Sequence, residues 1–440
     1  MSSPATRLLA VQALLTILPA NAVGRSLRQV LSQQSTLPPA ERGLLSDLLF
    51  GVCRHYRLLN HWLDQAMDKP LKGSAQAVRL ALLAGLYELW FTERPEHAVV
   101  NAWPDVCRQL KAGWASGLCN ALLRRASRQQ VDSFAGQQPL PIACSLPDWL
   151  WQQLCEAWPE QAANIARASL TAPPLAIRIA DPTARAALSD AGLTVRAGQW
   201  LTQAAILEPA RPVHDLPGFA DGLWSVQDEA AQWPATLIDC PAGARVLDAC
   251  AAPGGKTLQL LQQLPGIDLL ALDIDETRLA SVAANLNRAG QRAALCCGDA
   301  ADPDSWWDGR PFDAVLLDAP CSASGILRRQ PDIKWHRRAA DIDALCGLQR
   351  RMLDAIWPLI HAGGTLVYAT CSILPQENAR QIDEFLARHG DAREDTPVSA
   401  RSVATRRGCQ LLPKAGANDG FFFARLRKAP TLPSASAAAD

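Results

Sequence analysis

Residues Arg245 to Leu261 read RVLDACAAPGGKTLQLL, and this stretch decides the fold of the C-terminal half of the chain. A short aliphatic run is followed by a turn with Pro253, Gly254 and Gly255, and then by leucines at helical spacing. The pattern predicts a strand, a tight loop and a helix. Glycines let a ligand approach the backbone, and the start of a helix presents unpaired N–H groups. The loop therefore predicts a site for a nucleotide-like ligand.

From Gly243 onward, apolar strand-like runs alternate with helical patterns. The runs are RVLDAC, DLLALDID, AALCCGDA, FDAVLLDAP and GGTLVYATC. Such alternation predicts a doubly wound α/β sheet of the Rossmann-like class, in which loops at the ends of parallel strands meet at one crevice. The last segments, CQLLP and GFFFARLRK, predict a hairpin with Asn418, Asp419 and Gly420 at its turn.

The N-terminal part of the chain has a different pattern. Leucines recur at helical spacing from Ala5 to about Arg128, which predicts a helical bundle. The following stretch, from Gln129 to Trp149, contains glycine and prolines and predicts a linker. We expect a helical domain in 1–135, a linker with a small α+β module in 136–235, the α/β sheet domain in 236–428 and a disordered tail in 429–440.

The net charge is zero, but it is unevenly spread along the chain. Lys and Arg outnumber Asp and Glu by 15 to 8 in residues 1–130 and by 17 to 12 in 324–440, whereas acidic residues prevail by 23 to 11 in 131–323. Basic ends are compatible with a polyanion partner, and equally with solvated helix faces.

The cysteine pattern and the hydropathy exclude several classes of protein. The 13 cysteines include no C-x-x-C pair, so we expect reduced thiols in the cytoplasm, no disulfide framework and no metal site. No apolar run reaches the length of a membrane span. Residues Leu8 to Val23 suit an amphipathic helix better than a cleaved signal.

Carboxylates follow successive predicted strands of the sheet. The first loop lacks the G-x-G-x-x-G pattern of dinucleotide folds. Asp273 ends the second strand, where an acidic residue contacts ribose hydroxyls in such folds, and Asp299 follows the third strand on the adenine side. Either could be a helix cap instead. Since Lys256 is the only cation of the loop, the set suits an adenosine ligand without phosphates.

The motifs DACAAPGGKT, LDID, GDA, LLDAPCSASG and YATCSILPQEN resemble those of the RNA (cytosine-5) methyltransferases. The phrases LLFGVCRHYRLLNHWL and CNALLRR resemble the all-helical NusB-type RNA-binding domain. Together these resemblances imply S-adenosyl-L-methionine as cofactor and 16S ribosomal RNA as substrate, and we expect a monomer. By this resemblance the cofactor site comprises Cys250, Ala251, Ala252, Pro253, Gly254, Gly255, Lys256, Asp273, Asp299 and Asp318.

Two cysteines fit the chemistry of methylation at carbon 5 of cytosine. Carbon 5 is a weak nucleophile, so a thiolate must first add to carbon 6 of the ring. The spacing does not decide between Cys321 and Cys371. Analogy with DNA cytosine methyltransferases favours Cys321, whereas the resemblance to the RNA family implies Cys371 as nucleophile and Cys321 in product release. Asp318 would then hydrogen-bond the base.

The target cytosine has to leave its stack to reach a thiolate and a methyl donor together. Candidate phosphate contacts, each equally readable as an ordinary surface cation, are Arg54, Arg57, Arg124, Arg125, Arg328, Arg329, Lys334, Arg337 and Arg338. Two other interpretations are a tRNA substrate, or an RNA-binding factor whose sheet domain is inactive. The intact Cys321, Cys371 and Asp318 count against inactivity.

Overall fold

The computed structural model describes residues 4–19, 24–71, 73–397, 402–403 and 405–430. It divides into two compact units. One comprises Met1–Ala172 with Leu327–Ala339, and the other comprises Pro173–Ile326 with Ala340–Asp440. Most of the expected tail, 431–440, lies outside the described residues.

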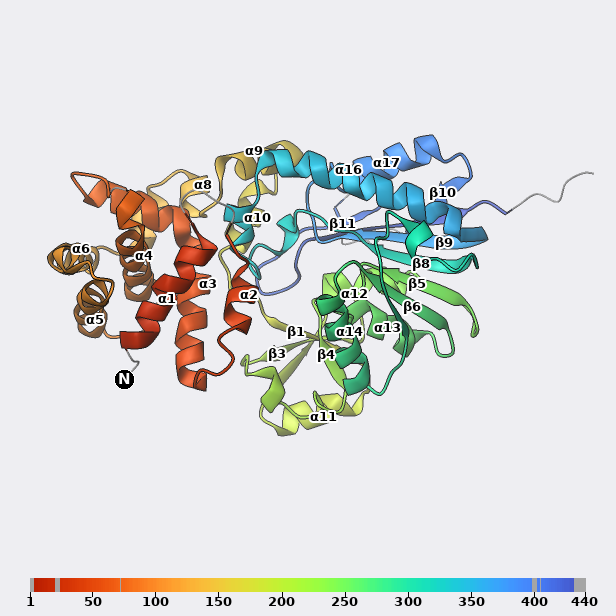
Figure 1. Ribbon diagram of the computed structural model, residues 1–440, viewed down its shortest axis with the longest axis horizontal. Helices are drawn as coiled ribbons and strands as arrows, with labels where there is room; N and C mark the ends of the chain where they lie inside the picture. Colours follow the sequence, from red (N-terminus) through yellow and green to blue (C-terminus); the bar gives the residue numbers. More distant parts are fainter. Residues whose placement is uncertain (1–3, 20–23, 72, 398–401, 404, 431–440) are drawn as a thin grey trace, which may run out of the picture. The chain divides into compact units, whose positions relative to one another are not determined.

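The first unit is helical throughout (Figure 1), as the leucine spacing predicts. Its helices are α1 (Pro4–Ile17), α2 (Leu27–Ser32), α3 (Pro39–Ala66), α4 (Gln76–Phe91), α5 (Glu96–Gln109), α6 (Ser116–Ala126), α7 (Val131–Gly136), α8 (Leu140–Ala143), α9 (Asp148–Ala157), α10 (Ala162–Ala168) and α15 (Ile333–His336).

A buried ion pair joins the helices of the bundle within their leucine core. The guanidinium of Arg7 on α1 donates to both oxygens of Glu88 on α4, at 2.6 and 2.9 Å. Trp103 Nε1 of α5 donates to the same carboxylate at 2.8 Å. Because Glu88 is fully buried, these donors satisfy a charge that would otherwise be costly. Helix α1 is thus part of the bundle, as its amphipathic pattern predicts.

The helical unit extends past the expected linker. Residues of that stretch form α7 and α8, and Phe134 and Leu146 are buried. Helices α9 and α10 also belong to this compact unit, the first part of which ends at Ala172. This stretch packs as part of the helical unit and does not form a free linker, because apolar side chains occur among its prolines and glycines.

The second unit begins with a small four-stranded antiparallel sheet in the order β2-β3-β1-β4. Helix α11 packs on it through Ala184 and Leu188, which share a core with Trp224. The α+β character predicted for this part is therefore confirmed. Its elements are β1 (Leu175–Ile179), α11 (Thr183–Asp190), β2 (Thr194–Ala197), β3 (Ala204–Glu208) and β4 (Trp224–Val226).

The rest of the second unit is an α/β domain around an eight-stranded sheet. The order is β10-β12-β9-β8-β5-β6-β7, with β11 paired to β12, and the run from β9 to β7 is parallel. The sheet is mixed rather than wholly parallel, because the predicted terminal hairpin adds antiparallel strands at one edge. The strands are β5 (Arg245–Ala249), β6 (Asp268–Asp273), β7 (Ala294–Cys297), β8 (Phe312–Asp318), β9 (Ile360–Thr370), β10 (Ala392–Glu394), β11 (Cys409–Leu411) and β12 (Phe421–Lys428).

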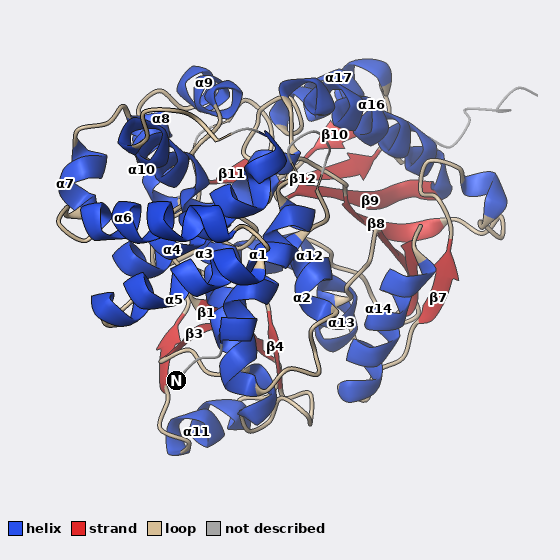
Figure 2. Ribbon diagram, turned by 60° about the vertical axis from the view of Figure 1, so that its left-hand side comes forward, coloured by secondary structure: helices blue, strands red, loops and turns tan. Residues whose placement is uncertain are grey.

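Helices cover both faces of this sheet (Figure 2), so its central strands are buried on both sides. One face carries α12, α13 and α14, and the other carries α16 and α17. No helix of the described chain is long and apolar enough to cross a membrane. The helices are α12 (Glu229–Thr236), α13 (Gly255–Gln263), α14 (Glu276–Arg288), α16 (Ala339–Ile356) and α17 (Ala379–Arg388).

Candidate active site

A cavity of about 220 Å³ opens where the parallel strands end. Strand β5 lies between β6 and β8, so the order in which successive strands join the sheet reverses here and leaves a crevice above the strand ends. The sequence-predicted residues that line it are Cys250, Ala252, Asp273, Asp299, Asp318, Cys321 and Cys371. Residues far apart in the sequence thus meet at one place.

The glycine loop lies between β5 and α13. Gly254 adopts φ +94° as the N-cap of α13, and a Cβ there would lie 3.1 Å from Cα of Val282. Only glycine takes this conformation without strain. Ala251, Pro253, Gly254, Gly255 and Lys256 belong to the loop and the first turn but not to the lining of the cavity.

Asp273 ties this loop to the end of β6. Its carboxylate accepts the N–H of Ala252 at 3.0 Å, and Arg278 on α14 lies 3.4 Å away. The guanidinium of Arg278 also donates to the carbonyl of Ala252 at 3.1 Å. A carboxylate and a guanidinium therefore border the cavity beside the loop, as suits a ligand with hydroxyl and carboxylate groups.

Asp318, which lines the cavity, forms an ion pair with Lys256 of the glycine loop. The Nζ and Oδ2 atoms are 2.6 Å apart, and the ammonium lies 5.0 Å from the centre of the Phe421 ring. Burial lowers the pKa of Lys256, but the Asp318 carboxylate more than offsets this, so the net shift is upward. Lys256 is thus a fixed cation, and the charge of Cys371 is a further cause of the upward shift of its pKa.

Cys321 follows β8 and Cys371 follows β9, and their Sγ atoms are 3.4 Å apart. The hydrogen bond with Cys371 and burial raise the pKa of Cys321, which favours the protonated form of this thiol. Burial likewise raises the pKa of Cys250, the third cysteine at the cavity. The loops are also joined by the N–H of Gly325, which donates to the Cys371 carbonyl at 2.9 Å.

Asp299 follows β7 and both lines the cavity and caps its own loop. Its Oδ1 accepts the N–H of Ala301 at 2.8 Å, and its carbonyl accepts from Trp306 Nε1 at 2.8 Å. The side chain of Asp299 therefore caps a turn after β7, not a helix, and also lines the cavity.

Sequence reasoning missed several residues at the cavity. Arg278 was detectable as a cation in the first turn after Asp273, but Met352 and Ile274 carry no signal beyond ordinary apolar character. Glu377 was missed as well, although it stands in the quoted motif YATCSILPQEN. Its carboxylate is fully buried beneath both cysteine loops.

The structure corrects part of the phosphate-contact hypothesis. Arg328 and Lys334 are each 1 % exposed, so the prediction is wrong for these two side chains. Lys334 Nζ donates to the carbonyl of Arg54 at 2.8 Å. Arg54 in turn donates to the carbonyl of Arg328 at 3.1 Å, and Arg57 pairs with Asp148 at 2.7 Å. These cations serve the packing of the helical unit.

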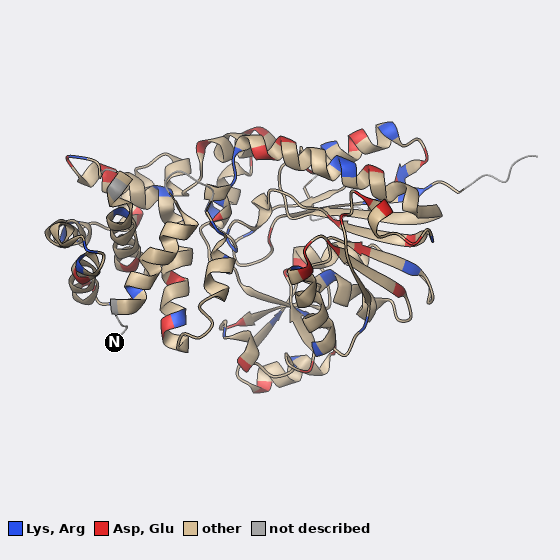
Figure 3. Ribbon diagram, viewed as in Figure 1, with Lys and Arg blue, Asp and Glu red and all other residues tan. Residues whose placement is uncertain are grey.

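Other cations pair with acidic side chains on neighbouring helices. Both signs of charge occur along α16 (Figure 3). Arg350 of α16 pairs with Glu384 of α17, and Asp354 of α16 accepts from Arg388 at 2.9 Å. The excess of basic residues after 324 therefore does not form one unpaired basic face on these helices.

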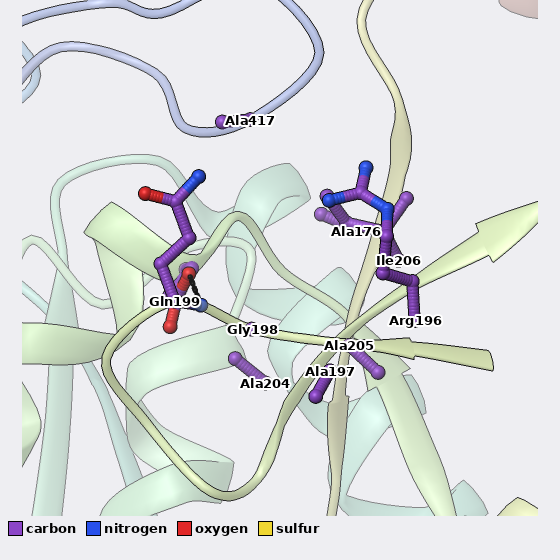
Figure 4. Close-up of a pocket in the computed structure, with 10 residues that line it drawn as sticks. Ala176, Arg196, Ala197, Gly198, Gln199, Ala204, Ala205, Ile206 and Ala417 are labelled. Carbon is purple, nitrogen blue, oxygen red and sulfur yellow. Dashed lines mark hydrogen bonds between the residues drawn. The ribbon is translucent and has the colours of Figure 1, made fainter.

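A second, smaller hollow lies on the antiparallel sheet (Figure 4). Its floor consists of alanines of β1, β2 and β3, with Arg196 and Gln199 on either side and Ala417 facing them. Arg196 donates to the Gly416 carbonyl at 3.0 Å and lies 3.3 Å from Glu208. The described residues contain no cluster of His, Cys, Asp and Glu suited to a metal ion.

Comparison with protein families divides the chain into three matched parts. Residues 235–427 match the model of the 16S rRNA methyltransferase RsmB/F family, and residues 4–128 match the NusB family. Residues 146–214 match the ferredoxin-like domain of RsmF/B-like methyltransferases.

Relatives cover nearly the whole chain. A Ribosomal RNA small subunit methyltransferase B from Pseudomonas putida is 43 % identical over 428 residues, covering 93 % of this chain and 98 % of the relative. One of the same name from Vibrio cholerae is 42 % identical, covering 92 % and 94 %. The solved structure titled PH0851 superposes with a TM-score of 0.78 at 21 % identity, covering 97 % of this chain and all of that one, and shows a shared fold.

Proposed function

This chain belongs to the 16S rRNA methyltransferase RsmB/F family, and we propose that it methylates carbon 5 of a cytosine in 16S ribosomal RNA through a covalent bond to Cys371. The methyl donor is S-adenosyl-L-methionine, whose sulfonium supplies an electrophilic methyl group. The carboxylates, guanidinium and glycine loop around the cavity fit its ribose, adenine and methionine parts. We further propose that the enzyme is a cytoplasmic monomer.

The observation that carries the proposal is the pair of thiols 3.4 Å apart beside a fixed cation. The Cys371 thiolate adds to carbon 6 of the cytosine, and the electrons of the 5,6 double bond make carbon 5 nucleophilic. Lys256 stabilises the negative charge at Cys371. The Asp318 carboxylate, held by Lys256, accepts a hydrogen bond from the exocyclic amine and, in the adduct, from ring nitrogen 3 once that nitrogen has taken a proton from water.

Release needs the second cysteine. After carbon 5 has accepted the methyl group, a water molecule takes the carbon-5 proton and the bond between carbon 6 and sulfur breaks. The electron pair of that bond returns to Cys371 as a thiolate. The S–H of Cys321 donates a hydrogen bond to this leaving sulfur, which lowers the barrier to elimination.

The experiment combines the full-length protein, S-adenosyl-L-methionine with a labelled methyl group, and separate 16S rRNA and tRNA. We expect label in 16S rRNA at a single 5-methylcytidine, located by bisulfite sequencing. Label found only in tRNA would identify tRNA as the substrate. No label in either RNA would favour a non-catalytic RNA-binding protein.

Two variants separate the roles of the cysteines. Cys371→Ala should reduce methylation to background while cofactor binding, measured by calorimetry, is retained. Cys321→Ala should accumulate a protein–RNA adduct, visible as a shifted band on a denaturing gel, because attack proceeds and release does not. Cys155→Ala in α9, which is not among the residues that line the cavity, is the matched control and should behave as wild type. An adduct in Cys371→Ala instead would reverse the two roles.

A further inference from the structure

One buried carboxylate connects the two cysteine loops. Oε1 of Glu377 accepts the N–H of Ser322 at 2.7 Å, and Oε2 accepts the hydroxyls of Ser322 at 2.5 Å and Ser372 at 2.6 Å. Ser322 directly follows Cys321, and Ser372 directly follows Cys371. The same carboxylate therefore holds the residue after each cysteine.

The serines under the thiols complete a closed polar network. The hydroxyl of Ser324 lies 3.0 Å from that of Ser322 and 3.1 Å from that of Ser372. The N–H of Ile373 donates to Ser324 at 3.0 Å, and Gln349 of α16 donates to Glu377 at 3.1 Å. All three serines and Glu377 are at most 3 % exposed. A buried network in which a carboxylate and three hydroxyls are hydrogen-bonded to one another holds its members in one arrangement.

Glu377 is surrounded by donors only, as suits an ionised carboxylate. Because the carboxylate is buried, water does not screen the interaction of its charge with the nearby sulfurs. After the hydrogen bond with Cys371, burial and the Cys371 charge, Glu377 also raises the pKa of Cys321. The charge of Cys371 in turn adds to the upward shift of the Lys256 pKa. One of the two sulfurs thus interacts with an anion and the other with a cation.

We propose that Glu377 is a positioning residue, which fixes the two cysteine loops against each other, keeps the shared proton on Cys321 and leaves Cys371 as the reactive sulfur. The inference rests on the proposed function for its role in methylation. The asymmetry between the thiols, however, is a property of the protein alone and can be measured without RNA.

The test is the relative rate of alkylation of the two thiols. Full-length protein is treated with limiting iodoacetamide at pH 7.5, and the Cys321 and Cys371 peptides are quantified by mass spectrometry. In the wild type, Cys371 should react first. In Glu377→Gln, the ratio of Cys371 to Cys321 alkylation should fall by about tenfold, the factor that one pKa unit represents. The variant keeps the shape of Glu377, and the serine hydroxyls can rotate to accept from its amide.

Glu384→Gln on α17 is the matched control, since Glu384 is half exposed and pairs with Arg350 away from the thiols. Its alkylation ratio should equal that of the wild type. An unchanged ratio in a Glu377→Gln protein that melts like the wild type would overturn the proposal. If Glu377→Gln does not fold, Ser322→Ala and Ser372→Ala each remove one arm of the network. Each should lower the ratio, and an unchanged ratio in both would likewise overturn it.

Methylation gives a second readout that a merely structural role would not produce. Glu377→Gln should lower kcat about tenfold while KM for RNA is unchanged, because the thiols change and the RNA-binding surface does not. If wild-type protein methylates no RNA, the proposed function fails, yet the alkylation ratio still decides the role of Glu377. A rise in KM with unchanged kcat would contradict the inference.

Discussion

Asp248 is a residue whose burial makes the stability of the protein depend on pH. It lies on β5 beneath the glycine loop and is fully buried, with Thr257 donating to Oδ2 at 2.6 Å. Burial raises its pKa from 3.8 to about 7. The folded protein therefore keeps a proton that the unfolded chain loses between about pH 4 and pH 7. Across that window the contribution of Asp248 to the free energy of unfolding falls as the pH rises.

We expect Asp248→Asn to remove this fall, because the amide is uncharged at every pH. At pH 8 the variant should be more stable than the wild type by on the order of 2–4 kcal/mol, and near pH 4 the two should agree. Melting temperature against pH measures this. Asp190→Asn, at an exposed position, should leave the wild-type profile unchanged. If the pH profile of Asp248→Asn ran parallel to that of the wild type, the assignment of this pH dependence to Asp248 would be contradicted.

Single residues also show which parts of the site could be predicted from the sequence. Cys321, Cys371 and Asp318 follow recognisable strands, so topology brings them to one edge and they could be predicted together. The role of Glu377 could not be predicted, since it depends on serine hydroxyls that contact its carboxylate from two loops. The burial of Arg328 and Lys334 could not be predicted either, because it depends on packing partners that are distant in the sequence.

At the scale of elements, the junction between β5 and α13 depends on one glycine. Gly254 combines a positive φ with close contact to Val282 on α14, so a side chain there is strained and also pushes two helices apart. Gly254→Ala should cost about 1–3 kcal/mol of unfolding free energy and weaken cofactor binding. Chemical denaturation and calorimetry measure the two effects.

The neighbouring glycine provides the control. A Cβ on Gly255 would meet no atom within 4 Å, and Gly255 begins α13 with an ordinary φ. Gly255→Ala should therefore change stability by less than about 0.5 kcal/mol. Equal destabilisation by both substitutions would show that the turn tolerates no side chain at all, contrary to this expectation. The order of these elements could be read from hydrophobic period, whereas the edge pairing of β10 with β12 could not, because β10 is short and polar.

At the scale of the whole molecule, Leu327–Ala339 belongs to the helical unit although it follows the Cys321 loop in sequence. Trp335 Nε1 donates to the Cys53 carbonyl at 2.7 Å, and its ring lies 5.0 Å from that of Tyr56. Asp332 accepts the N–H of Leu27 at 3.0 Å. Sequence reasoning assigned this stretch to RNA contact because its cations are visible in the sequence and its burial is not.

Trp335→Ala should therefore destabilise the helical unit, by about 2–4 kcal/mol for a large side chain that is partly buried. Differential scanning calorimetry should show the transition of this unit moving to lower temperature. Trp114→Ala, at a tryptophan that is 64 % exposed in the same unit, should leave the transition in place. A shift caused by Trp114→Ala and not by Trp335→Ala would refute the role of the segment.

The chain leaves the second unit at Ile326 and returns to it at Ala340. The helical unit consequently consists of two separate segments of the sequence, so it cannot be transferred to another protein as one contiguous fragment. A hybrid enzyme made by exchanging residues 1–172 alone would pair a foreign bundle with the resident Leu327–Ala339, and a working exchange has to carry both pieces from the same parent.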